Sequence, residues 1–312
     1  MKVVYTARLP QGAIGRVHER FPEVELVPAS PTDPGFEQAL KEAEVVAGWA
    51  PVEALLKCPN LRWLQFGSAG VESVVGRLPE TVKLTNASGV FDLVMAEHAF
   101  ALMLALVRGV DQMVRAQANC LWDPGVRRGE LFGKTLTIVG LGNVGRAVAE
   151  RAKCFGMRVM GVRRSTTEPV PGVDVLLSIS ELDLALPKTD HLLLVLPGGP
   201  HTRHVLDARR LALLPKGALV YNIGRGNAID ELALAGAIRS EHIAGAGLDV
   251  FETEPLPSTS PLWGLPNVII SPHVGGRTSL YPERFFDVFF DNLVRFHAGE
   301  PLKNEVDRYW GY

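Results

Sequence analysis

Residues 135–150 read TLTIVGLGNVGRAVAE, an apolar run followed by three closely spaced glycines and a helical pattern. The apolar run before Gly140 is typical of a buried strand, and the residues from Asn143 onward have helical spacing. Gly140 would make the tight turn between them, Gly142 would let a ligand approach the backbone, and Gly145 would allow close helix–strand packing. Because the motif follows a strand and opens a helix, it predicts the first turn of a dinucleotide-binding βαβ unit.

The helix that opens in this motif would bind phosphates, because its free N–H groups and its positive end point out of the turn. We therefore expect Asn143 and Val144 to contact the cofactor together with the three glycines. Later strands end at the same edge of a parallel sheet, where ligands of such sheets bind. Their ends supply the other expected cofactor residues, which are Leu196, Pro197, Ile223, Gly224 and Gly275.

The end of the next strand, RVMGV at 158–162, indicates which cofactor is used. NAD-selective sites place Asp or Glu there to bind the ribose 2′-hydroxyl. This chain has Arg163 and Arg164 instead, followed by Ser165. A pair of guanidinium groups binds a 2′-phosphate, so we expect NADP(H) to be preferred and NAD(H) to be possible. The alternative is two solvated arginines at a strand end.

Short apolar runs alternate with helical patterns on both sides of the motif, which predicts α/β domains with parallel sheets and helices on both faces. The expected strands are 3–7, 24–28, 45–49, 61–66 and 82–87 before the motif, and 158–162, 191–197, 218–224, 244–250 and 268–274 after it. A closing helix is expected at 282–298.

We expect two doubly wound parallel-sheet domains with a cleft between them. A flavodoxin-like substrate domain would comprise residues 1–95 plus 279–312, and a Rossmann dinucleotide-binding domain would comprise 96–278. One long helix is expected from about Asp92 to Ala118. Apolar residues lie around nearly the whole circumference of this helix. It should therefore be buried on more than one side, either in a homodimer interface or between the domains.

Three ionisable residues follow the nucleotide motif at strand ends or in loops: Arg225, Glu254 and His273. The guanidinium group of Arg225 would bind both the carboxylate and the oxo group of a 2-oxo acid and would polarise the oxo group. His273 would donate a proton to the carbonyl oxygen as a hydride arrives at carbon. Glu254 would lie behind His273 and stabilise its imidazolium form.

Composition excludes several other classes of function. The net charge of the 312 residues is −2, so no global field attracts nucleic acid or an anionic membrane. The longest apolar stretch, about 99–107, is too short to span a membrane. Cys58, Cys120 and Cys154 have no CxxC spacing, which favours three buried structural thiols and a reducing compartment, the cytoplasm by default. His201 and His204 lack a third ligand nearby, so no metal is expected.

Four motifs resemble the D-isomer-specific 2-hydroxyacid dehydrogenase family, over nearly the whole chain. They are GLGNVG (140–145), NIGRG (222–226), GLDVFETEPLP (247–257) and SPHVGG (271–276). The resemblance implies an NAD(P)-dependent oxidoreductase with Arg225 as the substrate-binding Arg and Glu254 and His273 as the proton relay. It also implies that Asp249 contacts the nicotinamide carboxamide. The backbone N–H groups of the Gly67–Val71 loop, with Ser68, Ala69 and Gly70, would bind the substrate carboxylate.

Within the family, GVRR, GWAPVE (48–53) and the ending VDRYWGY look like the glyoxylate/hydroxypyruvate reductase A branch. This likeness implies reduction of glyoxylate or hydroxypyruvate to the 2-hydroxy acid by NADPH, in a homodimer. Trp49 would then narrow the substrate pocket; the alternative is a core Trp that closes a strand. Two other functions stay open: an NAD-dependent D-lactate or phosphoglycerate dehydrogenase, and a dinucleotide-sensing regulatory protein like the co-repressors that resemble this family.

Overall fold

The computed structural model describes residues 1–126, 129–164 and 168–312. It divides into two compact units, which we call unit 1 and unit 2. Unit 1 consists of Met1–Phe91 and Thr278–Tyr312, and unit 2 consists of Asp92–Arg277. The chain therefore leaves unit 1 once and returns to it once, close to the boundaries 95/96 and 278/279 that the sequence indicates.

Unit 1 is built on a five-stranded parallel sheet in the order β2-β1-β3-β4-β5, which is the flavodoxin-like order. Its strands are β1 (Lys2–Tyr5), β2 (Glu25–Pro28), β3 (Val45–Gly48), β4 (Trp63–Phe66) and β5 (Lys83–Thr85). Its helices are α1 (Ala13–Arg20), α2 (Phe36–Lys41), α3 (Val52–Leu55) and α10 (Tyr281–Ala298).

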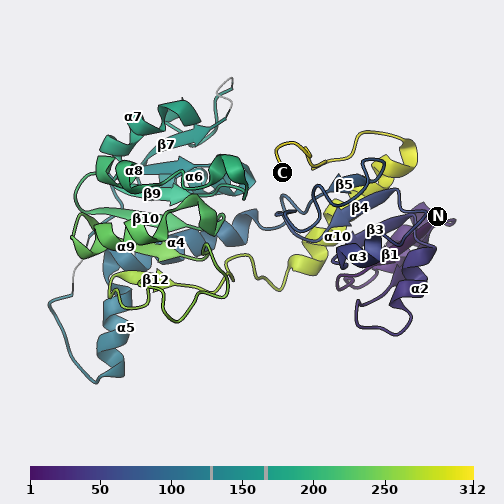
Figure 1. The fold of residues 1–312 in the computed structure, drawn as a ribbon, viewed down its shortest axis with the longest axis horizontal. Helices are drawn as coiled ribbons and strands as arrows, with labels where there is room; N and C mark the ends of the chain where they lie inside the picture. Colours follow the sequence, from purple (N-terminus) through teal and green to yellow (C-terminus); the bar gives the residue numbers. More distant parts are fainter. Residues whose placement is uncertain (127–128, 165–167) are drawn as a thin grey trace. The chain divides into compact units, whose positions relative to one another are not determined.

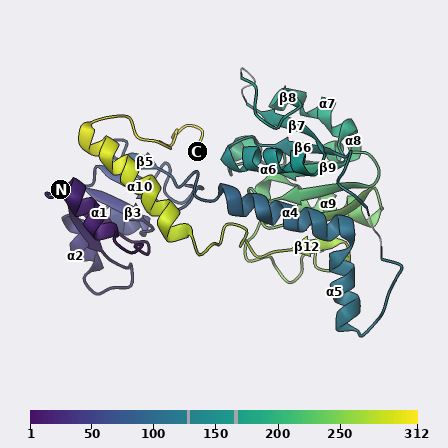
Figure 2. The ribbon, with the colours of Figure 1, turned by 180° about the vertical axis from the view of Figure 1, so that it is seen from behind.

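Helices cover both faces of this sheet because neighbouring residues of a strand point to opposite faces. Val3 and Tyr5 of β1 pack with residues of α1 and α10, whereas Val4 packs with residues of α2 and α3. Figure 1 shows α2 and α3 on one side of the sheet, and Figure 2 shows α1 and α10 on the other. Unit 1 is thus doubly wound, as predicted.

Unit 2 is built on a seven-stranded parallel sheet in the order β12-β11-β10-β9-β6-β7-β8. Counted from β6, this is the Rossmann strand order with one further strand. Its strands are β6 (Thr135–Val139), β7 (Arg158–Arg163), β8 (Val175–Ser178), β9 (His191–Leu194), β10 (Ala218–Asn222), β11 (Ile243–Leu248) and β12 (Val268–Ile270). Its α-helices are α4 (Asp92–Arg108), α5 (Val110–Ala118), α6 (Asn143–Cys154), α7 (Leu182–Ala185), α8 (Ala208–Leu213) and α9 (Glu231–Arg239).

The same alternation makes two cores in unit 2. Leu136 and Ile138 of β6 pack with α4 and α6, while Val139 belongs to the core that α7, α8 and α9 cover. The two sheets, each with helices on both faces, confirm the predicted α/β fold class. Strand β8 was not predicted, because its four residues are all only half-buried and follow a proline-rich loop.

The expectation of one helix from Asp92 to Ala118 is wrong. Helix α4 ends at Arg108, Gly109 takes a left-handed conformation with φ of 67°, and α5 continues at an angle of 71°. Helix α4 is central to its core, whereas no residue of α5 is buried, and α5 projects from the rest of unit 2 (Figure 1). Among the described residues no single helix is long and apolar enough to cross a membrane; α4 and α5 pass that test only as a bent pair.

Candidate active site

The glycine-rich turn between β6 and α6 has the geometry that its sequence predicts. Gly140 has a φ of 108°, and a Cβ there would overlap the carbonyl oxygen of Val195. A Cβ on Gly145 would overlap the carbonyl oxygen of Gly140, so the helix can approach the turn only without a side chain. At Gly142, by contrast, no atom of the described chain lies within 4 Å of the Cβ position. This turn therefore leaves space beside the N-terminus of α6, which suits a pyrophosphate.

This turn lies where the strand order reverses, since β6 pairs with β7 on one side and β9 on the other. Such a switch point is where ligands of open parallel sheets bind. Leu196 and Pro197 follow β9, and Ile223 and Gly224 follow β10. A Cβ on Gly224 would lie 2.6 Å from the backbone nitrogen of Leu196, so the two segments are in direct contact. The structure thus brings these expected cofactor residues to the same edge of the sheet.

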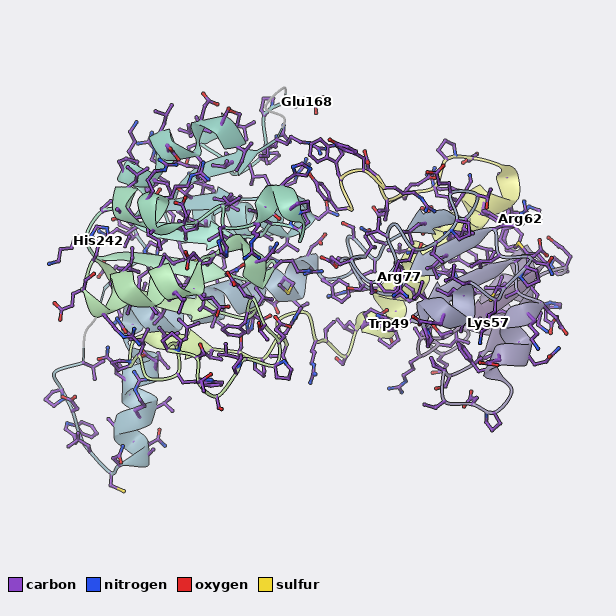
Figure 3. All side chains as sticks on the ribbon, viewed as in Figure 1. Trp49, Lys57, Arg62, Arg77, Glu168 and His242 are labelled. Atoms are coloured by element: carbon purple, nitrogen blue, oxygen red, sulfur yellow. The ribbon has the colours of Figure 1, made fainter. Side chains whose placement is uncertain are left out.

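Arg163 is the last residue of β7, beside β6, and Arg164 follows it. The Arg163 Nη2 donates to the carbonyl oxygen of Glu168 at 2.7 Å, and Glu168 is labelled in Figure 3. The Arg163 Nε is buried and has no hydrogen-bond partner in the described chain. No carboxylate occupies either position. Ser165, the third residue expected here, lies outside the described residues.

Two residues expected to form a proton relay are in contact in unit 2. His273 Nδ1 and Glu254 Oε2 are 2.7 Å apart. The other carboxylate oxygen of Glu254 accepts the N–H of Phe251 at 3.0 Å, so the carboxylate is fixed on both sides. The His273 side chain is 49% exposed. A histidine held in this way has one nitrogen occupied by the carboxylate and one available for proton transfer.

The backbone of His273 has a φ of 51°, which is uncommon for a residue with a side chain. Hydrogen bonds to Asp249 hold the chain on both sides of it. One oxygen of the Asp249 carboxylate accepts from Ser271 Oγ at 2.6 Å and from the Val274 N–H at 3.0 Å, and the other accepts from the Gly275 N–H at 3.0 Å. His98 Nε2 lies 3.4 Å from the first oxygen.

The charge state of Asp249 follows from these contacts. Burial raises the pKa of this carboxyl, but the hydrogen bonds from His98, Ser271 and the two N–H groups outweigh burial and hold the pKa below its usual value. A Cβ on Gly275 would lie 2.8 Å from both Asp249 and His98, so Gly275 is required for this packing. Both carboxylate oxygens of Asp249 therefore already accept hydrogen bonds within the protein.

Arg225 leaves β10 in an extended conformation and begins a short 3₁₀ turn, Gly226–Ala228. Its backbone oxygen accepts from Asn222 Nδ2 at 2.9 Å, and its Nη1 donates to the Gly224 carbonyl at 2.9 Å. A Cβ on Gly226 would overlap the backbone of Phe251. Since Phe251 also binds Glu254, the segment with Arg225 packs directly against the segment that carries the relay.

A second His–carboxylate pair lies in the same region: His204 Nε2 is hydrogen-bonded to Glu252. Glu231 Oε1 accepts the N–H of Glu252 at 2.6 Å. Burial raises the pKa of Glu231, and the charges of Glu252 and Glu254 raise it further against the opposing effect of that hydrogen bond. No group of three or more His, Cys, Asp or Glu side chains among the described residues is arranged to hold a metal ion.

Unit 1 carries the loop expected to bind a carboxylate, directly after β4. Trp49, which follows β3, is 42% exposed and stacks on Tyr281 with ring centroids 5.2 Å apart. A Cβ on Gly67 would lie 2.8 Å from the Trp49 ring, so the indole packs against the start of the loop. Figure 3 labels Trp49. It is therefore not a fully buried core residue.

Comparison with known proteins decides the family. Residues 100–275 match the family model described as D-isomer specific 2-hydroxyacid dehydrogenase, NAD binding domain. The chain is also 32% identical over 325 residues to a glyoxylate reductase of Korarchaeum cryptofilum, covering 98% of this chain and 96% of that protein. The chain belongs to the D-isomer specific 2-hydroxyacid dehydrogenase family. It is thus an NAD(P)-dependent oxidoreductase with the dinucleotide-binding domain of that family in unit 2.

Two solved structures of similar 2-hydroxyacid dehydrogenases carry the phosphorylated cofactor. The NADPH-dependent glyoxylate/hydroxypyruvate reductase of Sinorhizobium meliloti, in complex with NADP and sulfate, has a TM-score of 0.84 and 27% identity, covering 100% of this chain and 99% of that one. A family member from Xanthobacter autotrophicus Py2, in complex with NADPH and MES, has a TM-score of 0.84 and 30% identity at the same coverage.

Sequence reasoning missed the residues that support the site of this dehydrogenase. His98 lies on α4, and its contact with Ser271 joins residues 173 positions apart. Tyr281 is the first residue of α10, and its hydroxyl reaches Gly67 across 214 positions. No periodicity or motif in the sequence indicates either contact, because both depend on how distant elements pack.

Proposed function

We propose that the chain reduces a small 2-oxo acid, with glyoxylate or hydroxypyruvate favoured, to the 2-hydroxy acid by hydride transfer from NADPH. The observation that carries the proposal is the His273–Glu254 pair, 2.7 Å apart, with the segment of Arg225 packed against it. Glyoxylate reductase is also the name of the relative with which the chain is 32% identical over nearly its full length.

His273 is proposed as the general acid. Its Nδ1 is held by Glu254, so the proton that moves is the one on Nε2, and it goes to the carbonyl oxygen of the substrate. Glu254 orients the ring and stabilises its positive charge before the transfer. The neutral imidazole left behind regains its proton from water, which the exposed fraction of 49% permits. A nicotinamide bound at the sheet edge would supply the hydride.

Arg225 is proposed to bind the substrate and to polarise its carbonyl. A guanidinium can engage a carboxylate oxygen and the neighbouring oxo group at once, and it stabilises the negative charge that develops on the oxo group. The hydrogen bond from Asn222 holds the Arg225 backbone, and the bond from its Nη1 to the Gly224 carbonyl holds one side of the guanidinium group. One residue would therefore contribute both to affinity and to rate.

NADP(H) is proposed as the preferred cofactor. The free space at Gly142, the N-terminus of α6 and the two arginines at the end of β7 together fit a dinucleotide with a 2′-phosphate. The cofactors named for the two similar structures, NADP and NADPH, agree with this choice.

Unit 1 is proposed as the substrate domain, with the N–H groups of Ser68, Ala69 and Gly70 binding the carboxylate. Trp49 beside this loop is proposed to limit the length of the substrate, since its partly exposed indole is held by stacking on Tyr281. Unit 2 is proposed as the NADP(H)-binding domain.

A homodimer is proposed, formed through α5 and the segment that follows it. Val110, Met113 and Val114 of α5 are 44%, 43% and 58% exposed, and Leu121 and Trp122 are 60% and 93% exposed. Isolated exposed apolar residues are ordinary, but five in one short stretch are typical of an interaction site. The cytoplasm is proposed as the location, because all three cysteines are free. The expectation that all three are buried is wrong, since Cys58 is buried but Cys120 and Cys154 are exposed.

The test of this function is a substrate series with purified protein and NADPH. Glyoxylate, hydroxypyruvate, pyruvate and phosphohydroxypyruvate are compared by kcat/KM, and the hydroxy acid produced is identified. We expect the highest kcat/KM for glyoxylate or hydroxypyruvate. A higher kcat/KM for pyruvate or phosphohydroxypyruvate would overturn the substrate assignment, and no reduction of any of the four acids would overturn the reaction.

A further inference from the structure

In the loop after β4, three successive backbone carbonyl groups each accept a hydrogen bond from another part of unit 1. The Gly67 carbonyl accepts from the Tyr281 hydroxyl at 2.9 Å, the Ser68 carbonyl from the Ala87 N–H at 3.0 Å, and the Ala69 carbonyl from Asn86 Nδ2 at 3.1 Å. Three protein donors thus fix three consecutive peptide groups.

Fixing a carbonyl also fixes the next N–H group. A peptide unit is planar and trans, so the carbonyl of one residue and the N–H of the next lie in one plane and point in opposite directions. The three contacts therefore orient the N–H groups of Ser68, Ala69 and Gly70, away from the donors that hold the carbonyls. In the described chain neither Ser68 nor Ala69 donates its N–H to a protein acceptor, and Gly70 donates only to Ser68 Oγ at 3.3 Å. These N–H groups are preoriented for an anion.

Tyr281 differs from the other two donors because it comes from a distant part of the chain. It is the first residue of α10, three residues after the chain re-enters unit 1 at Thr278. Its ring is packed among aromatic side chains, with ring centroids 5.2 Å from Trp49, 5.4 Å from Phe285 and 5.7 Å from Phe91. Burial raises the pKa of its hydroxyl, so the hydroxyl stays protonated and remains a donor at all working pH values.

We propose that Tyr281 is a positioning residue for substrate binding: by holding the Gly67 carbonyl, its hydroxyl orients the Ser68 N–H toward the carboxylate of the 2-oxo acid. The inference rests on the proposed function of the Gly67–Val71 loop and adds to it the residue that sets the loop geometry. Because Tyr281 acts on binding of the acid and not on proton or hydride transfer, its loss should change KM for the acid and leave kcat and cofactor binding alone.

Unit 1 offers a matched control in Tyr5. This residue packs against the same helix, with ring centroids 5.8 Å from Phe285 and 5.3 Å from Phe289, and its hydroxyl is buried with no hydrogen-bond partner in the described chain. Tyr281→Phe and Tyr5→Phe therefore remove the same atom from the same aromatic cluster. Only the first removes the hydrogen bond to the loop.

The experiment compares the two variants with wild type by KM and kcat for glyoxylate, the Kd of NADPH, the inhibition constant of oxalate and Tm. For Tyr281→Phe we expect KM and the oxalate constant to rise by about 3- to 10-fold, as for the loss of one neutral hydrogen bond. We expect kcat and the Kd of NADPH to stay close to wild type, and Tyr5→Phe to leave all four kinetic and binding constants unchanged.

If wild type is active and the two variants have equal KM values for glyoxylate, this inference is overturned and the proposed function is not. A higher KM together with a lower kcat and weaker NADPH binding in Tyr281→Phe would also overturn it, because that pattern indicates general damage to the fold. Wild-type protein that reduces no 2-oxo acid would overturn the proposed function and this inference with it.

Discussion

At the scale of single residues, His273 is the side chain on which the proposed chemistry depends most. Removing a positioned general acid lowers a rate by about 10²–10⁴-fold, so His273→Ala should lower kcat for glyoxylate by that factor. Its contacts are with Glu254 and Asp249, so the Kd of NADPH should change little. Steady-state kinetics and a binding titration check this prediction.

The control for this prediction is His18→Ala, which removes an exposed histidine of α1 and should leave kcat unchanged. Turnover of His273→Ala close to wild type would show that another group donates the proton.

We assign the choice of cofactor to two further side chains, Arg163 and Arg164. A hydrogen bond to a charged group contributes about 1.5–3 kcal/mol, or about 10- to 150-fold in affinity. Replacing both Arg163 and Arg164 with Ala should therefore raise KM for NADPH by a factor in this range, reduced by whatever solvent screens the exposed Arg164. KM for NADH should hardly change, because NADH has no 2′-phosphate.

Arg158→Ala is the matched control, since this exposed arginine begins the same strand, β7, at its opposite end. Equal effects of the double substitution on both cofactors would refute the assignment of these arginines.

At the scale of elements, the turn between β6 and α6 can be tested by its glycines. Gly142→Ala adds a methyl group where no described atom lies within 4 Å, so Tm should stay close to wild type. The methyl would occupy the space that we assign to the pyrophosphate, and the Kd of NADPH should rise by about tenfold or more, equivalent to about 1.4 kcal/mol. Thermal unfolding and cofactor titration measure the two effects separately.

Gly236→Ala on α9 is the control, because it also has no neighbour within 4 Å of the added carbon and lies far along the chain from the turn. It should raise the free energy of unfolding by about 0.4–1 kcal/mol and leave NADPH binding unchanged. Unaltered NADPH affinity in Gly142→Ala would place the pyrophosphate elsewhere.

Elements with strong apolar patterns could be predicted from the sequence, and weakly patterned ones could not. The buried strands β6, β9 and β10 coincide with long apolar runs, and the Gly140–Gly145 motif has the backbone geometry that its glycines indicate. Strand β8 is only half-buried and gave no comparable signal. The bend at Gly109 was missed because the apolar pattern of α4 continues into α5, although a glycine that takes a positive φ commonly ends a helix.

The proposed catalytic residues were also accessible from sequence, but the contacts that hold them were not. Arg225, Glu254 and His273 stand out because each lies at or after the end of a strand in a glycine- or proline-rich context. The support of His273 by Asp249 and His98, and of Gly67 by Tyr281, joins segments far apart in sequence. Such contacts follow from packing of α4 and α10 on their sheets, which a single sequence does not encode as a local pattern.

At the scale of the whole molecule, the proposed homodimer makes a separate prediction. Val114 is 58% exposed on α5, and an aspartate there would place a charge in the apolar face that we assign to the interface. Val114→Asp should therefore shift the mass measured by light scattering at micromolar concentration from dimer to monomer. Leu232→Asp, at a 74% exposed leucine of α9, should leave the dimer intact. A monomeric wild-type protein would exclude the proposed interface.

We infer that the molecule is an NADPH-dependent reductase of small 2-oxo acids. The most direct test is kcat/KM for glyoxylate and hydroxypyruvate, measured on the wild-type protein with NADPH and with NADH at the same pH and salt. We expect reduction of at least one of these acids, with a kcat/KM about 10- to 150-fold higher with NADPH than with NADH. Equal or faster reduction with NADH, or no reduction of either acid with either cofactor, would contradict it.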